Sequence, residues 1–306
     1  MHASSAPPAS GTRAASYYLG CPIWATDRWK GALFTARAPR KEWLRQYSQV
    51  FNTVEGNSTF YGLPSRETTQ RWLEDSADGF RFALKFPRVI SHERRLIGAE
   101  SETREFLDVL SLLGAAERLG PSFLQLPPDF ARGEWPALER FLRRLPREFP
   151  YAVEVRHRDY FDQGENEQRL DALLQELKMD RVLLDSRALF SAPPSDETEA
   201  RAQKRKPRSP HRLTVTGKRP LVRFIGRNNV DEVTPWLRDW APVVAKWMEE
   251  GLTPYFFAHA PDDTFAPALA RSFHTELMRH TPNLGTLPAW PGETELWQTQ
   301  KQQRLF

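Results

Sequence analysis

The 306-residue sequence has a single cysteine, Cys21, so no disulfide can form within the chain. An isolated cysteine is more often a small buried residue than a nucleophile, and both interpretations of Cys21 stay open. A chain without disulfides fits a reducing compartment, so we expect a cytoplasmic protein.

Long hydrophobic runs are also missing, which argues against a transmembrane helix. Residues 1–16 are small and polar, include two prolines and lack the apolar stretch of a secretory signal, so we predict a disordered arm there. No G-x-S-x-G, G-x-x-x-x-G-K or G-x-G-x-x-G pattern occurs where the corresponding fold would need it. These absences argue against serine hydrolases, P-loop enzymes and dinucleotide-binding proteins.

Short metal-binding patterns such as H-E-x-x-H and C-x-x-C are absent as well. His157, His259 and several carboxylates are suitable ligand types, so a divalent metal stays an alternative that the spacing does not favour.

Hydrophobic and charged residues are both abundant in the sequence. The chain is 40% hydrophobic and 27% charged, with a formal net charge of +4. It is therefore able to form a sizeable core, and its mild basic excess is compatible with an anionic partner such as nucleic acid. Part of that excess lies in one run, KRKPR at 204–208.

Short apolar runs alternate with segments that have apolar residues at helical spacing. The runs begin roughly 30 to 40 residues apart, which is the length of a strand–helix repeat. They are YYLG (17–20), FNTVEG (51–56), FRFALKF (80–86), SFLQLP (122–127), YAVEVRH (151–157), RVLLDS (181–186), LVRFIG (221–226) and PYFFAHA (254–260). Eight such repeats predict the α/β class and a single-domain TIM-like (β/α) barrel over 17–285, with an open doubly wound sheet as the alternative.

Three segments depart from this repeat. Residues 187–212 are rich in proline, serine and charged residues, so we expect a loop or disordered insertion. This insertion is either a functional segment, such as a mobile lid or a basic arm, or a solvated loop without a function of its own. Pro235 and Pro242 predict a break in the helical segment 231–251. Residues 286–306 form a C-terminal tail.

Polar side chains occur within or just after the predicted strands, although a buried parallel strand should be almost wholly apolar. If the strands close into a barrel, these side chains meet at one end, where barrel enzymes keep their sites. The candidate catalytic residues are the carboxylates Glu55, Glu154 and Asp185. The candidate substrate-binding residues are Asn57, Tyr61, Lys85, Gln125, Arg156, Arg223 and His259. Three cations among them suit a phosphate or carboxylate ligand, whereas internal ion pairs that merely fill the barrel are the alternative.

Several of these motifs together resemble one family. FNTVEGNSTFYGLPSRETTQRW, GFRFALKFPRVISH, LGPSFLQLPPDF, AVEVRHRDYF and LVRFIG are similar to the YecE-like family, domain of unknown function 72, over residues 17–280. The resemblance implies a TIM-like barrel in a bacterial cytoplasmic protein, with no established activity. Its recurrent polar positions coincide with most of the residues assigned above. Two positions depart from the family pattern: Ile225 replaces a histidine, and the last strand ends in Ala258 and His259 instead of paired asparagines.

The last five residues, QQRLF, are similar to the peptide with which bacterial proteins bind the DNA sliding clamp. Gln302, Leu305 and Phe306 are the candidate partner-binding residues, and docking of this tail on its own barrel is the alternative. Two hypotheses follow, and they leave open whether the protein is an enzyme. One is a barrel that binds an anion and acts on a phosphoester or nucleic acid, and the other is a non-catalytic DNA-associated protein recruited to the clamp.

Overall fold

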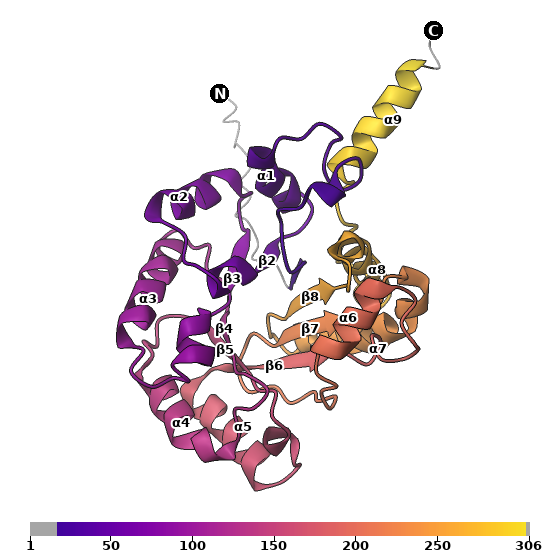
Figure 1. Cartoon of the computed structure of the whole chain (residues 1–306). Coiled ribbons are helices and arrows are strands. Elements are labelled where there is room, and N and C mark those ends of the chain that lie inside the picture. The colour runs from indigo at the N-terminus through magenta and orange to yellow at the C-terminus, as the bar shows by residue number, and fades with distance from the viewer. Residues whose placement is uncertain (1–16, 304–306) are drawn as a thin grey trace, which may run out of the picture.

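The computed structural model describes residues 17–303, in which parallel strands alternate with helices (Figure 1). The strands are β1 (Tyr18–Gly20), β2 (Thr53–Gly56), β3 (Arg81–Leu84), β4 (Ser122–Gln125), β5 (Tyr151–Glu154), β6 (Asp180–Asp185), β7 (Leu221–Ile225) and β8 (Tyr255–His259). The helices are α1 (Trp43–Ser48), α2 (Arg66–Asp75), α3 (Glu100–Ala115), α4 (Trp135–Arg144), α5 (Glu165–Leu177), α6 (Glu197–Arg205), α7 (Val230–Glu249), α8 (Ala266–Met278) and α9 (Pro291–Gln303). Single turns of helix lie at η1 (Asp27–Trp29), η2 (Arg40–Glu42), η3 (Asn57–Phe60), η4 (Val89–Glu93), η5 (Arg132–Glu134), η6 (Arg158–Phe161) and η7 (Asp263–Phe265).

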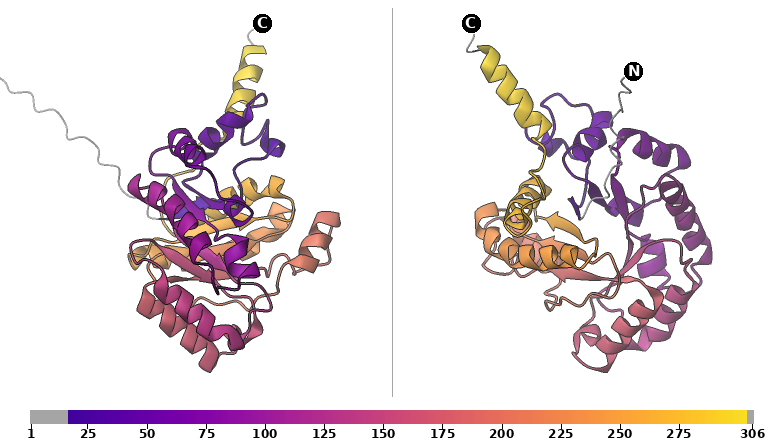
Figure 2. Two further views of the ribbon diagram at one scale, coloured as in Figure 1. Left: turned by 60° about the vertical axis from the view of Figure 1, so that its left-hand side comes forward. Right: turned by 180° about the vertical axis from the view of Figure 1, so that it is seen from behind.

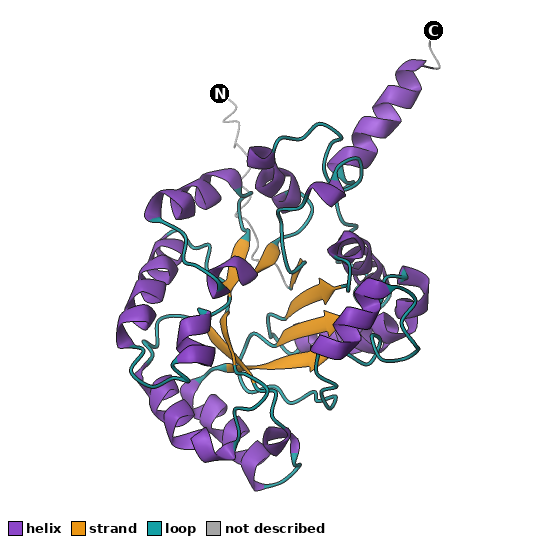
Figure 3. Cartoon of the chain, viewed as in Figure 1, coloured by secondary structure: helices purple, strands orange, loops and turns teal. Residues whose placement is uncertain are grey.

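The strands belong to two sheets. One has the order β1-β8-β7-β6-β5-β4, and the other pairs β2 with β3. Between the sheets, Glu55 N–H donates to the Cys21 carbonyl at 3.1 Å, and Phe86 N–H donates to the Phe123 carbonyl at 3.0 Å. The expected α/β class and a barrel-like arrangement are therefore confirmed, with helices outside and strands inside (Figure 3).

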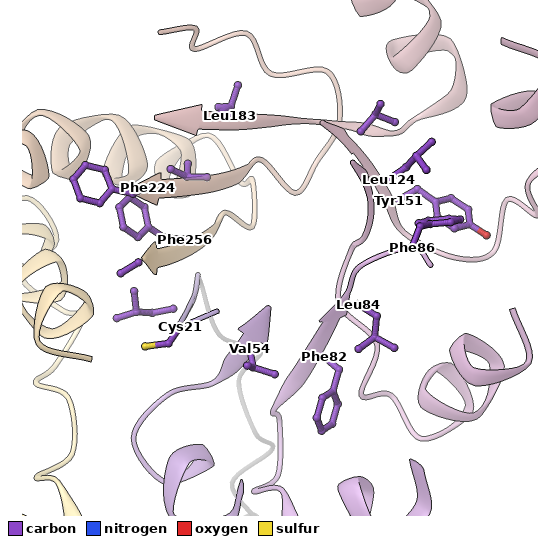
Figure 4. Packing of buried hydrophobic residues seen from close by; sticks show 14 of the residues in the cluster. Cys21, Val54, Phe82, Leu84, Phe86, Leu124, Tyr151, Leu183, Phe224 and Phe256 are labelled. Atoms are coloured by element: carbon purple, nitrogen blue, oxygen red, sulfur yellow. The ribbon is translucent and has the colours of Figure 1, made fainter. Parts of the chain in front are cut away.

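Alternation along the strands divides the core into two layers. Outward residues such as Leu183, Phe224 and Phe256 join the large cluster that packs against the helices (Figure 4). A smaller buried cluster takes residues from seven of the strands, which places it on the inner side of the curved sheets. Its members are Tyr18, Ala83, Phe123, Ala152, Val182, Leu221, Tyr255 and Phe257. This apolar layer fills the interior at the level where the strands begin.

Helix α7 runs through both of its prolines, although the sequence predicted a break there. Proline removes a backbone donor and clashes with the preceding turn, which usually kinks or ends a helix. Here the buried face that includes Val233, Leu237 and Trp240 packs toward the core, and burial of that face holds the helix together.

Residues 187–212 also differ from the expected loop, because they contain the helix α6. Its Glu199 is fully buried and accepts hydrogen bonds from Arg227, at 2.9 Å, and from the backbone amides of Ser195 and Asn228. This buried ion pair attaches α6 to the segment after β7. Charge composition alone could not reveal it, because the same residue types form solvated loops.

The tail contains α9, whose base packs on the residues after η1. Ala36 N–H donates to Glu295 at 2.7 Å, and Arg271 pairs with Glu293 at 2.9 Å. From there α9 extends away from the rest of the molecule (Figure 2), leaving Trp297 62% exposed. None of the helices within residues 17–303 is long and apolar enough to cross a bilayer.

Candidate functional site

Side chains from five strands meet where those strands end. Gln125 and Glu154 are the last residues of β4 and β5 and lie opposite each other in register. Glu55 is the penultimate residue of β2, Arg223 lies within β7, and His259 ends β8. With Asn57 and Arg156, which follow β2 and β5, they form a hydrogen-bonded group that we call the polar cluster. Its members are Glu55, Asn57, Gln125, Glu154, Arg156, Arg223 and His259.

Arg223 is the centre of the polar cluster. Its Nε and Nη2 donate to the two oxygens of Glu55 at 2.7 and 2.8 Å, which is the bidentate geometry that suits arginine and carboxylate. Its Nη1 donates to Glu154. All three side chains are buried, so Arg223 joins β7 to β2 and β5 across the interior.

Further hydrogen bonds connect Glu154 and Glu55 to the other members of the polar cluster. Arg156 donates from Nε to Glu154 at 2.6 Å and from Nη2 to Gln125 at 2.8 Å. Glu55 also receives Nδ2 of Asn57 at 2.7 Å and lies 3.0 Å from Nε2 of His259. The structure brings these residues together, although they are scattered in the sequence from position 55 to position 259.

Both carboxylates are held in the ionised form. Burial alone would raise the pKa of Glu154, but the guanidinium groups of Arg223 and Arg156 lower it to about 2. Burial acts in the same direction on Glu55, and Arg223 with His259 brings its pKa well below the usual range. A carboxylate with so low a pKa and its oxygens already bound is a poor proton acceptor at neutral pH. In this arrangement Glu55 and Glu154 anchor the two arginines.

Lys85 follows β3 and differs from the polar cluster. It is 8% exposed, its Nζ lies 3.8 Å from the centre of the Phe60 ring, and it has no ion pair with any carboxylate in residues 17–301. Burial is the main cause that lowers its pKa to about 7, and the positive charge of Arg223 adds to it. Lys85 is thus a buried amine close to two arginines, and the negative charges of Glu154 and Glu55 only partly oppose the lowering of its pKa.

Two predicted site residues lie elsewhere. Asp185 ends β6 on the outward face, where its carboxylate accepts from the Arg187 side chain at 2.8 Å and from Nε1 of Trp240 at 2.7 Å. These bonds hold its pKa below the usual value against the opposing effect of burial. Tyr61 is 80% exposed and contacts Phe60 edge to face. The structure does not bring Asp185 into the polar cluster, because Asp185 alternates with the inward residue Leu184.

Sequence reasoning missed two titratable residues near the polar cluster. Lys206, just after α6, is half-buried, and burial together with Arg223 and Arg156 lowers its pKa to about 8. Asp263, after β8, is also half-buried, and burial raises its pKa to about 6 while Lys206 opposes the rise. The basic run 204–208 was a signal for Lys206, but composition could not show which of its residues turns inward.

Potential metal ligands do not gather in this region. Across the part of the chain that the structure describes, no three histidine, cysteine, aspartate or glutamate side chains are grouped so that they could share an ion. Leu305 and Phe306, and the side chain of Gln302, lie outside the described residues.

Comparison with known proteins identifies relatives of the whole chain. A family model described as "Protein of unknown function DUF72" matches residues 18–294. The UPF0759 protein YecE of Escherichia coli K12 is 39% identical over 280 residues, covering 92% of this chain and 99% of that protein. The UPF0759 protein YunF of Bacillus subtilis 168 is 24% identical over 165 residues, covering 52% of this chain and 57% of that protein.

Solved structures agree on the fold. A DUF72 family protein of Thermotoga maritima superposes with a TM-score of 0.65 at 20% identity, covering 86% of this chain and 98% of that one. A DUF72 family protein of Enterococcus faecalis gives a TM-score of 0.66 at 18% identity, covering 85% and 95%. At these identities the likeness concerns the fold alone.

Proposed function

The chain belongs to the DUF72 family, as its sequence motifs indicated, and we propose that it binds a small molecule carrying a phosphate or carboxylate group. The proposed site lies at the carboxyl ends of the strands, with Lys85 and Arg156 as its main cations. The proposal treats the two sheets as one closed TIM-like barrel, in which all strand ends face a common mouth. It places the protein in the bacterial cytoplasm.

The observation that carries the proposal is the burial of the Lys85 amine without an ion pair among the described side chains. A buried cation without a counter-charge is costly, and proteins usually neutralise it, pair it or use it. The carboxylates of Glu154 and Glu55 relieve this cost only in part, because they already bind Arg223 and Arg156. An anionic ligand beside Lys85 would supply the missing charge and raise the pKa of the amine again.

The surroundings of Lys85 support an anion. Arg156 keeps 13% of its side chain exposed, and Lys206 is a further half-buried cation nearby. The negative charges of Glu55 and Glu154 offset the positive charges of Arg223 and Arg156. Lys85 and Lys206 add further positive charge. The carboxylate of Asp263, with its pKa near 6, balances only part of it.

The same groups suit proton transfer. Efficient acid–base catalysis requires groups whose pKa lies near the working pH. Lys85, with its pKa near 7, and Asp263, with its pKa near 6, meet that requirement better than Glu55 or Glu154. We therefore propose Asp263, which is mostly ionised at pH 7, as the candidate base and Lys85, which is protonated once the anion binds, as the candidate acid of a phosphoester- or nucleic-acid-directed reaction.

Titration calorimetry at pH 7 tests the binding step. The probes are inorganic phosphate, glycerol 3-phosphate, acetate and a short single-stranded oligonucleotide, with glycerol as the uncharged reference. At least one anion should bind to the wild type, and Lys85→Met should weaken it by about tenfold or more, because a charge-assisted hydrogen bond is lost. Lys41→Met is the matched control, because Lys41 is an exposed lysine that forms no hydrogen bond or ion pair with the polar cluster. Equal affinities for wild type and Lys85→Met would refute the proposed site.

A second candidate function is recruitment to the DNA sliding clamp as a non-catalytic DNA-associated protein. The observation that favours it is α9, which extends from the body and carries the sequence that ends in Gln302, Leu305 and Phe306 (Figure 1). Such a helix would present a terminal peptide to the groove of a partner. A pull-down with a purified bacterial clamp tests this, since removal of residues 302–306 should abolish retention. Equal retention of the full and shortened chains would exclude it.

A further inference from the structure

A cavity of about 440 Å³ lies between α3 and α4, on the outer side of the helices and away from the polar cluster. Its walls are the loop 96–99, the first half of α3, α4 from Ala137 onward and residues 145–146. No residue of the polar cluster lines it, so an inference drawn from this cavity stands apart from the proposed function.

The floor of the cavity is apolar. Leu96, Phe141 and Leu145 are buried in it, and Leu107 adds to the wall. Ile97 stands at the edge with 63% of its surface exposed, which is unusual for an isoleucine beside a hollow. Drug-sized ligands typically occupy hollows of roughly 300–1,000 Å³ with mostly apolar walls, so the cavity has the size and surface of a small-molecule site.

One polar atom on the wall lacks a partner. Thr103 Oγ1 is buried and makes no hydrogen bond within the described residues. A buried hydroxyl without a partner is costly, and native proteins rarely tolerate one unless water or a ligand completes it. Rotation of the Thr103 side chain would bring this hydroxyl, which is now covered, to a ligand oxygen in the cavity.

Three arginines surround the opening. Arg104 and Arg140 are exposed and form no ion pair within residues 17–301, whereas Arg144 pairs with Glu100 at 3.2 Å. Both members of that pair are about two-thirds exposed, so water screens the pair strongly. The rim of an apolar cavity therefore carries two uncompensated positive charges.

The loop at the edge of the cavity is held in an uncommon conformation. Arg95 and Leu96 have φ of 48° and 69°, in the left-handed region that non-glycine residues seldom adopt. Arg95 is fixed there by Glu134, with Nε donating at 2.6 Å, and by Asp129 at 3.2 Å. Strained segments of this kind cluster at ligand clamps, and here the ion pairs of Arg95 fix the start of the loop that forms one wall of the cavity.

We propose that this cavity binds an acyl carboxylate, with the hydrocarbon chain on the floor of Leu96, Leu107 and Phe141 and the carboxylate at the rim. Arg104 and Arg140 supply the charge that recognises the carboxylate. The partly enclosed shape fits a single chain better than a flat protein surface, and the two unpaired arginines select an anion over a neutral lipid.

Titration calorimetry of the full chain tests this with sodium decanoate, sodium octanoate and 1-decanol below their aggregation limits. Decanoate should bind more tightly than octanoate by roughly fourfold per methylene, as expected for a buried chain. Decanol should bind at least tenfold more weakly than decanoate, because it lacks the charge that the arginines recognise.

Two variants separate the charge from the cavity. Arg140→Gln should weaken decanoate by about tenfold and leave decanol unchanged, whereas Ala137→Leu should fill the cavity and weaken both. Arg37→Gln is the matched control, because Arg37 is exposed and does not line the cavity. Equal binding of decanoate by wild type and Arg140→Gln, or no binding by the wild type, would overturn the proposal. Retained phosphate binding in Arg140→Gln would show that the site at the strand ends is separate.

Discussion

Replacing Arg223 by methionine should destabilise the protein strongly, because Arg223 neutralises two buried carboxylates at once. Removing one partner of a buried ion pair typically costs about 3–5 kcal/mol, since the other charge stays buried without compensation. Glu55 would keep Asn57 and His259, and Glu154 would keep Arg156. These remaining partners place the expected loss at the lower end, about 3 kcal/mol.

Urea unfolding at pH 7 measures this loss directly. Arg45→Met is the matched control, because Arg45 pairs with Asp75 at 2.9 Å on the surface, with 61% of its side chain exposed. Exposed pairs contribute about 0–1 kcal/mol, so the control should lose little. An Arg223→Met protein that loses no more than Arg45→Met would refute the account of the polar cluster.

The deficit of Arg223→Met should also depend on pH. In the wild type the pKa of Glu154 is about 2, below its unfolded value of about 4.3, so this glutamate stabilises the fold above pH 4.3 and ceases to do so as the pH falls toward 2. Without Arg223, burial raises the pKa of both carboxylates, and acid then relieves the penalty by protonating them. The gap between variant and wild type should shrink from pH 7 to pH 4, and a constant gap would contradict this reasoning.

Three further substitutions test neighbouring claims. Lys85→Met should be more stable than the wild type at pH 6, and the difference should shrink toward pH 10. The pKa of Lys85 is about 7 in the folded protein and roughly 10.4 in the unfolded chain, so the cost of burying its charge is largest at low pH. Urea unfolding at both pH values checks this. Asp185→Asn should lose about 1–3 kcal/mol in the same assay, because Trp240 and Arg187 lose a charged acceptor, while anion affinity stays unchanged in calorimetry. Glu199→Gln should accelerate tryptic cleavage within 204–208 by about tenfold, because it loosens the ion pair that holds α6, and an unchanged rate in limited proteolysis would argue against that role.

The sequence allowed the convergence of the polar cluster to be predicted because charges in buried strands are rare and need a reason. Glu154 and Arg156 lie two residues apart at the end of β5 and face the same side, which the structure confirms through their 2.6 Å hydrogen bond. Arg223 and Glu55 are 168 residues apart, and their contact followed only from the expectation that all strand ends meet. The prediction that these side chains meet therefore depended more on the expected fold class than on any local motif.

Asp185 shows the limit of that reasoning. It ends a strand like Glu154 does, but the register with β7 places Leu184 opposite Arg223 and turns Asp185 outward to Trp240. A shift of one residue reverses the face of a strand, and the sequence did not fix the register of β6. Asp185 is consequently part of the packing between β6 and α7.

Lys206 was missed for a different reason. Its neighbours 204 and 205 are exposed lysine and arginine, and a basic run of this composition usually stays in solvent. The buried pair of Glu199 with Arg227, together with hydrogen bonds from the Gln203 side chain to the carbonyls of Leu189 and Ala192, fixes α6 so that the residue after it faces the strand ends. Such a contact depends on tertiary packing, and neither periodicity nor composition encodes it.

The pKa of the Lys85 amine is the most direct test of the proposed anion site. Carbon-13 labelling of lysine side chains, with the Lys85 resonance assigned from Lys85→Met, allows a pH titration with and without phosphate. The account predicts a pKa near 7 in the free protein and a clear rise when the anion binds. A pKa near the ordinary lysine value, unchanged by phosphate, would contradict it.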